Sequence, residues 1–291
     1  MNSNIKSQFY RTFLEYGIKG VVSRIVYHVR CRFVSIYRKK EWKHLPPQED
    51  LLLNVLQDAF VLIILDACRY DYFKKNYQKY INGKFKAVRS PASNTPGWLK
   101  IIFRKYAERL ENIKIFSANP HLHSKSRKIT EFTARDYVKG EIIDLWDSGW
   151  DSELGTVEPN TVFMAVEKEG LNEKNLIWFM QPHFPWIGET RVQIPDNVLM
   201  LRRRGINLNQ LFNRETKLGN ISKCVVRRAY EDNLLLVLQI VKKLLNNLQF
   251  AGKVVVTSDH GELLGEHGVF MHPPYLSLPE QRIVPWLEIC D

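Results

Sequence analysis

Val254-Val255-Val256-Thr257-Ser258-Asp259-His260-Gly261-Glu262 predicts a buried strand that ends in an acidic turn bearing an imidazole. Its four β-branched residues favour a strand, and the glycine allows the backbone to turn sharply after them. Adjacent aspartate and histidine side chains at such a turn supply part of the ligand shell of a divalent metal ion. The alternative is a plain turn that only ends the strand, and this stretch alone does not decide between the two.

Short apolar runs of the same kind alternate along the chain with helical patterns. The runs cover residues 59–65, 113–117, 176–180, 253–257 and 283–289, and the helical patterns cover residues 98–110, 159–169 and 222–248. Continuous apolar strands that alternate with helices predict an α/β fold, with a mainly parallel sheet covered by helices on both faces.

The composition bounds the class of protein. The chain has 291 residues, of which 45% are hydrophobic and 25% charged, as is typical of a globular protein with a sizeable core. Its four cysteines form no CxxC pair, which argues against a disulfide framework and favours a reducing compartment. The longest apolar run, residues 59–65, is too short to cross a bilayer, and no signal-peptide core is present. We therefore expect a cytoplasmic protein, with peripheral contact at the membrane surface as an addition.

The basic charge is concentrated near the N-terminus. Residues 1–45 hold ten lysines and arginines against two glutamates, a balance of +8 within the net charge of +11. Apolar residues from Ile18 to Tyr37 recur at helical spacing, so the segment predicts an amphipathic basic helix. Either the helix packs on its own domain, or it contacts an anionic membrane surface through residues 16–38. Nucleic acid is not an expected partner, because no binding motif accompanies the charge.

Two composition shifts predict the organisation of the chain. Pro46-Pro47 ends the basic segment, since a proline pair cannot continue a helix, so we expect an N-terminal helical segment over residues 1–50 and a main domain over residues 51–291. Residues 187–221 are polar, interrupt the alternation and predict an insertion or lid. The triplet Arg202-Arg203-Arg204 in this segment is either a solvated surface or a clamp for phosphate.

Polar groups follow the predicted strands. In parallel sheets, ligands bind beyond the carboxyl ends of the strands. Asp66 follows the first strand, His183 follows the strand at 176–180, and Asp259 with His260 follows the strand at 253–257. Residues 90–97 form a turn-rich segment before a helix, where a hydroxyl group lies at a helix N-terminus that favours an anion.

Four of these segments together resemble the alkaline phosphatase–sulfatase superfamily, and within it the compact sulfatase-like hydrolases. They are similar, in the family's order, to a first metal motif, a nucleophile segment, a substrate-side histidine motif and a second metal motif. The segments are Leu65-Asp66-Ala67-Cys68-Arg69-Tyr70-Asp71, Ser90-Pro91-Ala92-Ser93-Asn94-Thr95-Pro96, Gln181-Pro182-His183-Phe184-Pro185 and Ser258-Asp259-His260-Gly261-Glu262 with its continuation to Gly268. The resemblance runs from about residue 58 to the end, and it implies an alkaline-phosphatase-like three-layer sandwich with a catalytic domain over residues 51–291.

The resemblance implies a role for each matching residue. The family's metal ligands match Asp66, Thr95, Asp259 and His260. Thr95 also matches the nucleophile, and His183 and His272 match histidines that contact the transferred group or the leaving oxygen. A divalent ion lowers the pKa of the threonine hydroxyl, and the ion and the histidines offset charge that develops on the phosphoryl or sulfuryl oxygens. The implied intermediate is a phosphothreonine, which water or another alcohol resolves.

Two departures from the family pattern narrow the chemistry. Sulfatases of the family convert a cysteine or serine, closely followed by proline and arginine, to formylglycine. Thr95-Pro96-Gly97-Trp98-Leu99 supplies neither the cysteine nor the arginine, which favours phosphate esters over sulfate esters. Relatives with two metals place an aspartate four residues before the histidine that matches His183, where this chain has Phe179. We therefore expect one tightly bound divalent ion (manganese, zinc or magnesium, with calcium a further candidate) and, at most, a second ion held less tightly by His183 and His272.

Several positions have a plainer alternative. Thr95 is also a candidate N-cap of the helix that follows, and Ser93 is the rival nucleophile. Arg69 and Asp71 are expected to pair with each other. Glu262 is either an acceptor for a ligand's hydrogen bond or a solvated side chain.

The expected function is that of a metal-dependent hydrolase or phosphotransferase acting on phosphate mono- or diesters through a threonine nucleophile. The expected substrates are esters of a lipid or envelope glycan, a choice that depends on the basic amphipathic helix. Two alternatives stay open: a sulfate ester hydrolase, and a non-catalytic relative that binds an anionic glycan or lipid. Gly97-Trp98, where relatives often carry a polar residue, keeps the second alternative open.

Overall fold

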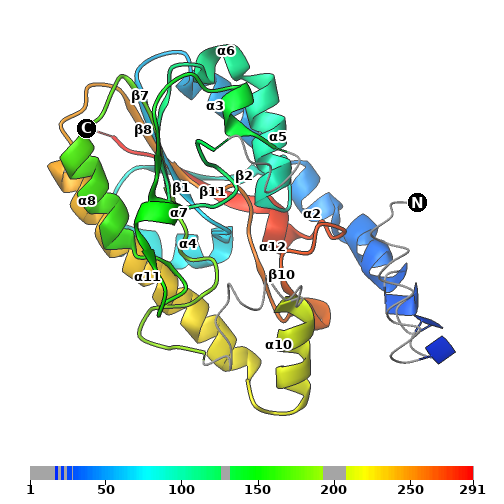
Figure 1. Ribbon diagram of the computed structural model, residues 1–291. Helices are drawn as coiled ribbons and strands as arrows, with labels where there is room; N and C mark the ends of the chain where they lie inside the picture. Colours follow the sequence, from blue (N-terminus) through cyan, green and yellow to red (C-terminus); the bar gives the residue numbers. More distant parts are fainter. Residues whose placement is uncertain are drawn as a thin grey trace.

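A seven-stranded sheet forms the centre of the computed structural model, which describes residues 17–18, 21–22, 25–27, 29–125, 132–192 and 208–290. Its strands, in spatial order, are β2 (Lys84–Arg89), β11 (Ile283–Glu288), β8 (Lys253–Thr257), β1 (Phe60–Leu65), β7 (Lys174–Phe179), β3 (Lys114–Ser117) and β4 (Ile142–Asp144). The pairs from β8 to β4 are parallel, and β11 runs antiparallel to both of its neighbours. The predicted α/β fold with a mainly parallel sheet is confirmed (Figure 1).

Strand β1 shows why the apolar runs are continuous. All six of its residues are buried, with Phe60, Leu62 and Ile64 packing on one face of the sheet. The residues between them pack on the other face, because side chains alternate along a strand. A strand covered on both faces therefore needs an apolar residue at every position.

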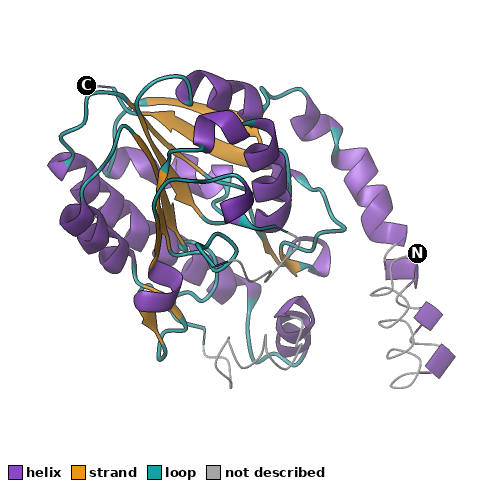
Figure 2. Ribbon diagram, turned by 45° about the horizontal axis from the view of Figure 1, so that its top comes forward, coloured by secondary structure: helices purple, strands orange, loops and turns teal. Residues whose placement is uncertain are grey.

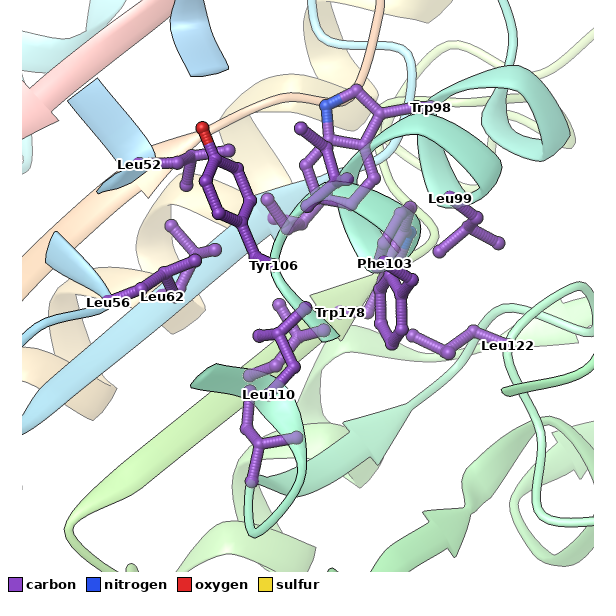
Figure 3. Packing of buried hydrophobic residues seen from close by; sticks show 14 of the residues in the cluster. Leu52, Leu56, Leu62, Trp98, Leu99, Phe103, Tyr106, Leu110, Leu122 and Trp178 are labelled. Atoms are coloured by element: carbon purple, nitrogen blue, oxygen red, sulfur yellow. The ribbon is translucent and has the colours of Figure 1, made fainter. Parts of the chain in front are cut away.

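Three helices cover one face of the sheet: α3 (Gln48–Val55), α5 (Thr95–Lys105) and α6 (Ala107–Leu110). Figure 3 shows Tyr106 near Leu52, Leu56 and Leu62, and Phe103 near Leu122, on this face of the sheet. Gln48 ties this layer to the sheet, since its side chain accepts from Nε1 of Trp98 at 2.8 Å and donates to the carbonyl oxygen of Ser258 at 2.7 Å. The N-terminus of α5 is thereby fixed beside the end of β8.

Helices α4 (Tyr70–Asn76), α8 (Pro159–Glu169) and α11 (Lys223–Asn247) cover the other face. Helix α11 begins after Ser222, whose hydroxyl accepts from the backbone N–H of Val225, and it spans the predicted residues 222–248 to within one residue at each end. Figure 2 shows the sheet between the two sets of helices, so the predicted three-layer sandwich is confirmed.

The structure corrects three details. The helix predicted over residues 98–110 begins earlier, at Thr95, and breaks at Tyr106, whose hydroxyl donates to the carbonyl oxygen of Glu49. Strands β2 and β4 have mixed burial and lack the continuous apolar pattern that predicted the others. The last strand is antiparallel, which a run of apolar residues does not reveal.

The predicted insertion over residues 187–221 is described only in part. Residues 193–207, with the arginine triplet, lie outside the described residues. Helix α10 (Leu208–Lys217) packs through Phe212 against Phe184 and Trp186, whose ring centroids lie 5.4 Å away. The role of this segment as a lid, and the division of the chain near residue 50, stay predictions.

Candidate metal centre and active site

The carboxyl ends of three adjacent strands bring the predicted site residues together. In the sheet, Ile64 of β1 lies in register with Trp178 of β7 and Thr257 of β8. The segments that follow these strands therefore leave the sheet at one edge, which is where ligands bind in parallel sheets. Asp66 and the pair formed by Asp259 and His260 meet there.

Asp66, Asp259 and His260 form a compact group of candidate metal ligands. One potential ligand atom from each lies within 4.8 Å of the other two, and all three residues are at most 1% exposed. Nε2 of His260 lies 3.2 Å from Oδ2 of Asp259. Two carboxylates and one imidazole are a ligand set that manganese, zinc and magnesium all accept.

Thr95 directs its hydroxyl at this group from the first turn of α5. Its Oγ1 donates to Oδ2 of Asp259 at 2.8 Å and lies 3.2 Å from Nε2 of His260. Asn94, not Thr95, is the N-cap, since its side chain accepts from the backbone N–H of Gly97 at 2.9 Å. The interpretation of Thr95 as a plain N-cap is therefore wrong, because the capping position is already filled by its neighbour.

The imidazole of His260 is held in the tautomer that a metal ligand needs. Its Nδ1 lies 2.9 Å from the carbonyl oxygen of Gly261, which can only accept, so Nδ1 carries the proton. The lone pair of Nε2 then faces the Thr95 hydroxyl and the two carboxylates. Burial lowers the pKa of His260 below its usual value, although Asp259 opposes the change, and the ring stays neutral.

Asp66 is the second buried carboxylate, and its environment tests whether the site suits a cation. Its Oδ2 accepts from Nε1 of Trp178 at 3.1 Å and from Nδ2 of Asn119. Burial raises the pKa of Asp66 well above its usual value, and the charge of Asp259 raises it further. Two buried carboxylates without a cation are costly, since hydrogen bonds only partly replace their hydration. A divalent cation between them removes this cost, so the donor set fits a metal ion.

Removing the charge of Asp66 is therefore expected to stabilise the metal-free protein. In the folded protein the raised pKa means that Asp66 binds its proton more tightly than in the unfolded chain. The free energy of unfolding then falls as pH rises from its ordinary pKa of 3.8 through the raised value. The variant Asp66→Asn escapes this loss, so with a chelator present its Tm should exceed that of the wild type at neutral pH. Thermal unfolding across pH checks this: the difference should shrink below about pH 4, and a less stable variant at neutral pH would contradict the account.

Backbone and hydroxyl groups around the strand ends fix the carboxylate of Asp259. The N–H of Ala67, a residue with a left-handed φ of 56°, donates to Oδ1 of Asp259 at 3.1 Å. Tyr230 of α11 holds Ala67 in this conformation by donating to its carbonyl oxygen at 2.8 Å. The hydroxyl of Ser258 donates to the carbonyl oxygen of His260 at 2.6 Å. Asp259 is thereby turned so that Oδ2 faces Thr95.

A second group of candidate ligands lies beside the first. His183, Glu262 and His272 each place one ligand atom within 4.8 Å of the other two. Oε1 of Glu262 lies 3.1 Å from Nδ1 of His272 and 3.9 Å from Nε2 of His183. The rings of His260 and His272 have centroids 4.4 Å apart, so the two groups adjoin. A second ion at these residues stays a prediction.

The two groups open into one pocket. It is lined by Asp66, Thr95, Pro96, Asn119, Pro120, His121, Met180, His183 and His272. Asn119 and Trp178, which hold Asp66, were not identified in the sequence. Asn119 follows β3, so its place at a strand end was the available signal. Glu262 was considered only as a hydrogen-bond acceptor or a solvated side chain, but it is fully buried.

The structure settles the plainer expectations. Arg69 and Asp71 form the expected ion pair, with Nη2 and Oδ2 2.7 Å apart, and Arg69 also pairs with Glu266 at 2.8 Å. Phe179 is fully buried in the core, so the position of the family's additional aspartate lies away from the pocket. Cys68 is buried as well.

Comparison with solved structures identifies the fold. The soluble domain of lipooligosaccharide phosphoethanolamine transferase A from Neisseria meningitidis superposes with a TM-score of 0.52 at 16% identity, over 79% of this chain and 76% of that domain. The periplasmic domain of EptC from Escherichia coli, in complex with zinc, gives 0.52 at 12% identity, over 80% of this chain and 72% of that one. The predicted three-layer α/β sandwich is thereby confirmed as the fold of these transferase domains. No family model and no curated protein sequence matches the chain.

The full-length Neisseria enzyme, an integral membrane protein, covers more of this chain. It matches 98% of the chain with a TM-score of 0.52 at 16% identity, while the chain spans 59% of that protein. Among the residues that the structure describes here, no helix is long and apolar enough to cross a bilayer.

The expected cytoplasmic location is wrong. The similar structures are a periplasmic domain and an integral membrane protein. The expectation depended on scattered cysteines and on the lack of a long apolar run. Neither feature determines the cellular compartment of a domain with this fold.

Proposed function

We propose that this chain is a metal-dependent phosphoester transferase or hydrolase in which Thr95 is the nucleophile. The observation that carries the proposal is the position of Oγ1 of Thr95, within 3.2 Å of both Asp259 and His260 and on the wall of the pocket. The likeness to phosphoethanolamine transferases supports phosphate ester chemistry.

Asp66, Asp259 and His260 would hold one divalent ion, with Thr95 facing it. Such an ion supplies a lowered pKa for the threonine hydroxyl and positive charge beside the phosphoryl oxygens. Zinc is the first choice of metal, because zinc is bound by one of the similar structures and because an imidazole in the ligand set suits it.

Thr95 would attack phosphorus in line with the leaving oxygen. The Oγ1–P bond forms as the P–O bond of the ester breaks, and the hydroxyl proton leaves along the hydrogen bond to Asp259. The product is a phosphothreonine and an alcohol. Attack by water or an acceptor alcohol then breaks the Oγ1–P bond and returns a proton to Thr95.

His183 and His272 would contact the phosphoryl group and the leaving oxygen. Nδ1 of His183 donates to the carbonyl oxygen of Phe184, and its Nε2 lies 3.9 Å from Oε1 of Glu262, on the wall of the pocket. Glu262 lies beside Nδ1 of His272 at 3.1 Å, and a buried carboxylate there stabilises the protonated imidazole. His272 is thus the better proton donor to the leaving alcohol.

The substrate proposed is a phosphodiester, with a lipid or envelope glycan as donor or acceptor. The similar Neisseria protein is a lipooligosaccharide phosphoethanolamine transferase, which supports a diester of this class. Sulfate esters are less favoured, since Thr95 cannot become formylglycine.

Three chromogenic esters test the proposal. The purified chain is supplied with Zn²⁺, Mn²⁺ or Mg²⁺ and offered p-nitrophenyl phosphate, bis-p-nitrophenyl phosphate and p-nitrophenyl sulfate in parallel. Turnover of a phosphate ester that is lost with the metal supports the proposal. Turnover of the sulfate alone would indicate a sulfatase, and metal binding without turnover, together with no transfer from a phosphatidylethanolamine donor, would indicate a binding protein.

A further inference from the structure

The N-terminal helix exposes an apolar face that nothing in the described structure covers. Residues 25–27 and 29–38 are helical, and α2 (Lys40–Lys43) continues them toward the body. Large apolar side chains are exposed along this segment: Ile18, Val22, Ile25, Val26, Val29, Phe33, Ile36 and Tyr37. Phe33 and Tyr37 are each 70% exposed and Ile18 is 72% exposed. Exposed apolar side chains gathered in this way mark an interaction surface.

These side chains form one stripe, which we call the apolar stripe. At 3.6 residues per turn, all eight positions fall within a sector of about 120°. The opposite side of the helix faces the body. Cys31 is buried there against Leu263, Val269 and Leu276, and Tyr27 and Val34 pack beside it.

An ion pair fixes which way the stripe points. Nη1 of Arg38 lies 2.8 Å from Oε1 of Glu280, at the start of α12 (Pro279–Arg282). Arg38 and Cys31 lie on the same side of the helix, so the packed side is anchored at both points. The stripe therefore points away from the body, and Figures 1 and 2 show the helix at the edge of the molecule.

Basic residues border the stripe. Arg30 lies along one edge of it, and Arg32 and Lys39 lie along the other, all three exposed. Lys40 lies over the ring of Tyr37, with Nζ 4.4 Å from the ring centroid. An apolar stripe bordered by cations on both edges matches the boundary between acyl chains and anionic headgroups. A second protein chain that covered the stripe would also bury the bordering cations, and their desolvation is unfavourable.

We propose that the apolar stripe docks on the surface of an anionic lipid bilayer, with the helix lying in the plane of the headgroups. Val22, Val26, Val29 and Phe33 enter the boundary with the acyl chains, and the bordering arginines and lysines contact lipid phosphates. The helix is held to the body through Leu276 and Glu280, so docking would bring the domain to the lipid surface. The inference concerns the surface and does not depend on the reaction proposed above.

Flotation of the full chain with lipid vesicles tests the docking surface. The chain is mixed with vesicles of phosphatidylcholine alone, or with about one-third phosphatidylglycerol. The wild type should float with the anionic vesicles and bind the neutral ones more weakly, and added salt should reduce binding. The double variant Val29→Asp, Phe33→Asp should bind the anionic vesicles at least about tenfold more weakly, because two charged groups replace apolar contacts. The matched control is Met164→Asp on α8, an apolar residue that is 55% exposed on another surface and should leave binding unchanged.

Thermal unfolding and sedimentation velocity accompany the flotation. Both exposed positions tolerate substitution if the stripe is free, so the Tm of the double variant should stay close to that of the wild type. Equal flotation of variant and wild type would overturn the proposal. A wild-type dimer that the double variant converts to a monomer, without vesicle binding by either, would show that a second copy covers the stripe, and would also overturn it.

Discussion

Replacing Thr95 with valine is expected to lower kcat for phosphate ester turnover by about four orders of magnitude. Valine keeps the shape of threonine and removes the hydroxyl that donates to Asp259. The covalent route is then closed, and only the bound metal and the histidines remain to act on water. The measurement is single-turnover release of p-nitrophenol, together with mass spectrometry of the peptide that contains residue 95.

Two neighbouring variants control this result. Thr95→Ser keeps a hydroxyl at the same place and should retain measurable turnover. Ser93→Ala removes the rival hydroxyl and should leave kcat within a few-fold of the wild type. Full activity of Thr95→Val would rule out Thr95 as the nucleophile. Loss of activity in Ser93→Ala alone would assign the nucleophile to Ser93 instead. A phosphorylated peptide trapped in the wild type and absent from Thr95→Val would support the covalent step.

Replacing Asp259 with asparagine is expected to weaken metal binding by at least about a hundredfold. Loss of a residue that only hydrogen-bonds to a metal ligand already lowers metal affinity by about ten- to a hundredfold, and Asp259 is proposed as a ligand itself. Asparagine preserves the acceptor for the N–H of Ala67 and removes the negative charge of one of the two candidate carboxylate ligands. The affinity is measured by isothermal titration of the chelator-treated protein with Zn²⁺. Turnover at a fixed, low metal concentration should fall in parallel.

Asp71→Asn is the matched control for the metal. Asp71 lies in the same motif as Asp66, but it pairs with Arg69 and its side chain is 58% exposed. Its replacement should leave the affinity for Zn²⁺ unchanged within a few-fold. Equal affinities for Asp259→Asn and the wild type would mean that the ion binds elsewhere, with His183, Glu262 and His272 the first alternative.

The residues of the candidate site could be placed beside one another from the sequence because they follow strands. Parallel strands that are neighbours in a sheet bring their carboxyl ends to one edge, so a polar residue after each apolar run is placed without knowing the loops. Asp66 and Asp259 follow strands β1 and β8, which are direct neighbours. Thr95 was located by the resemblance, and by its place before a helix.

Residues that act through tertiary contacts could not be predicted in this way. Trp178 belongs to the apolar run of β7, and only the packed sheet shows that its Nε1 reaches Asp66. Glu262 follows the metal motif, but its contact with His272 depends on a turn whose path is set by β9 (Leu263–Leu264) and β10 (Phe270–Met271). The direction of β11 likewise depends on which edge of the sheet the chain returns to.

The N-terminal helix packs on its own domain, as one interpretation of its sequence expects, and it leaves exposed the apolar side on which the membrane interpretation depends. Amphipathic spacing predicted one apolar face, but the segment has a packed side and an exposed side, both apolar in part. Cys31 and Val34 lie on the side that packs on the body, whereas Val29 and Phe33 lie on the exposed side. The spacing of apolar residues alone cannot separate the packed side from the exposed side, because both sides carry apolar residues at helical spacing.

The most direct test of the central claim is the anomalous scattering of a crystal of this protein grown with Zn²⁺. The account predicts one strong peak about 2.0–2.2 Å from a carboxylate oxygen of Asp66, a carboxylate oxygen of Asp259 and Nε2 of His260, with Oγ of Thr95 facing it. A peak held only by His183, Glu262 and His272, or Asp66 turned away from the ion, would contradict the claim that these side chains share one cation.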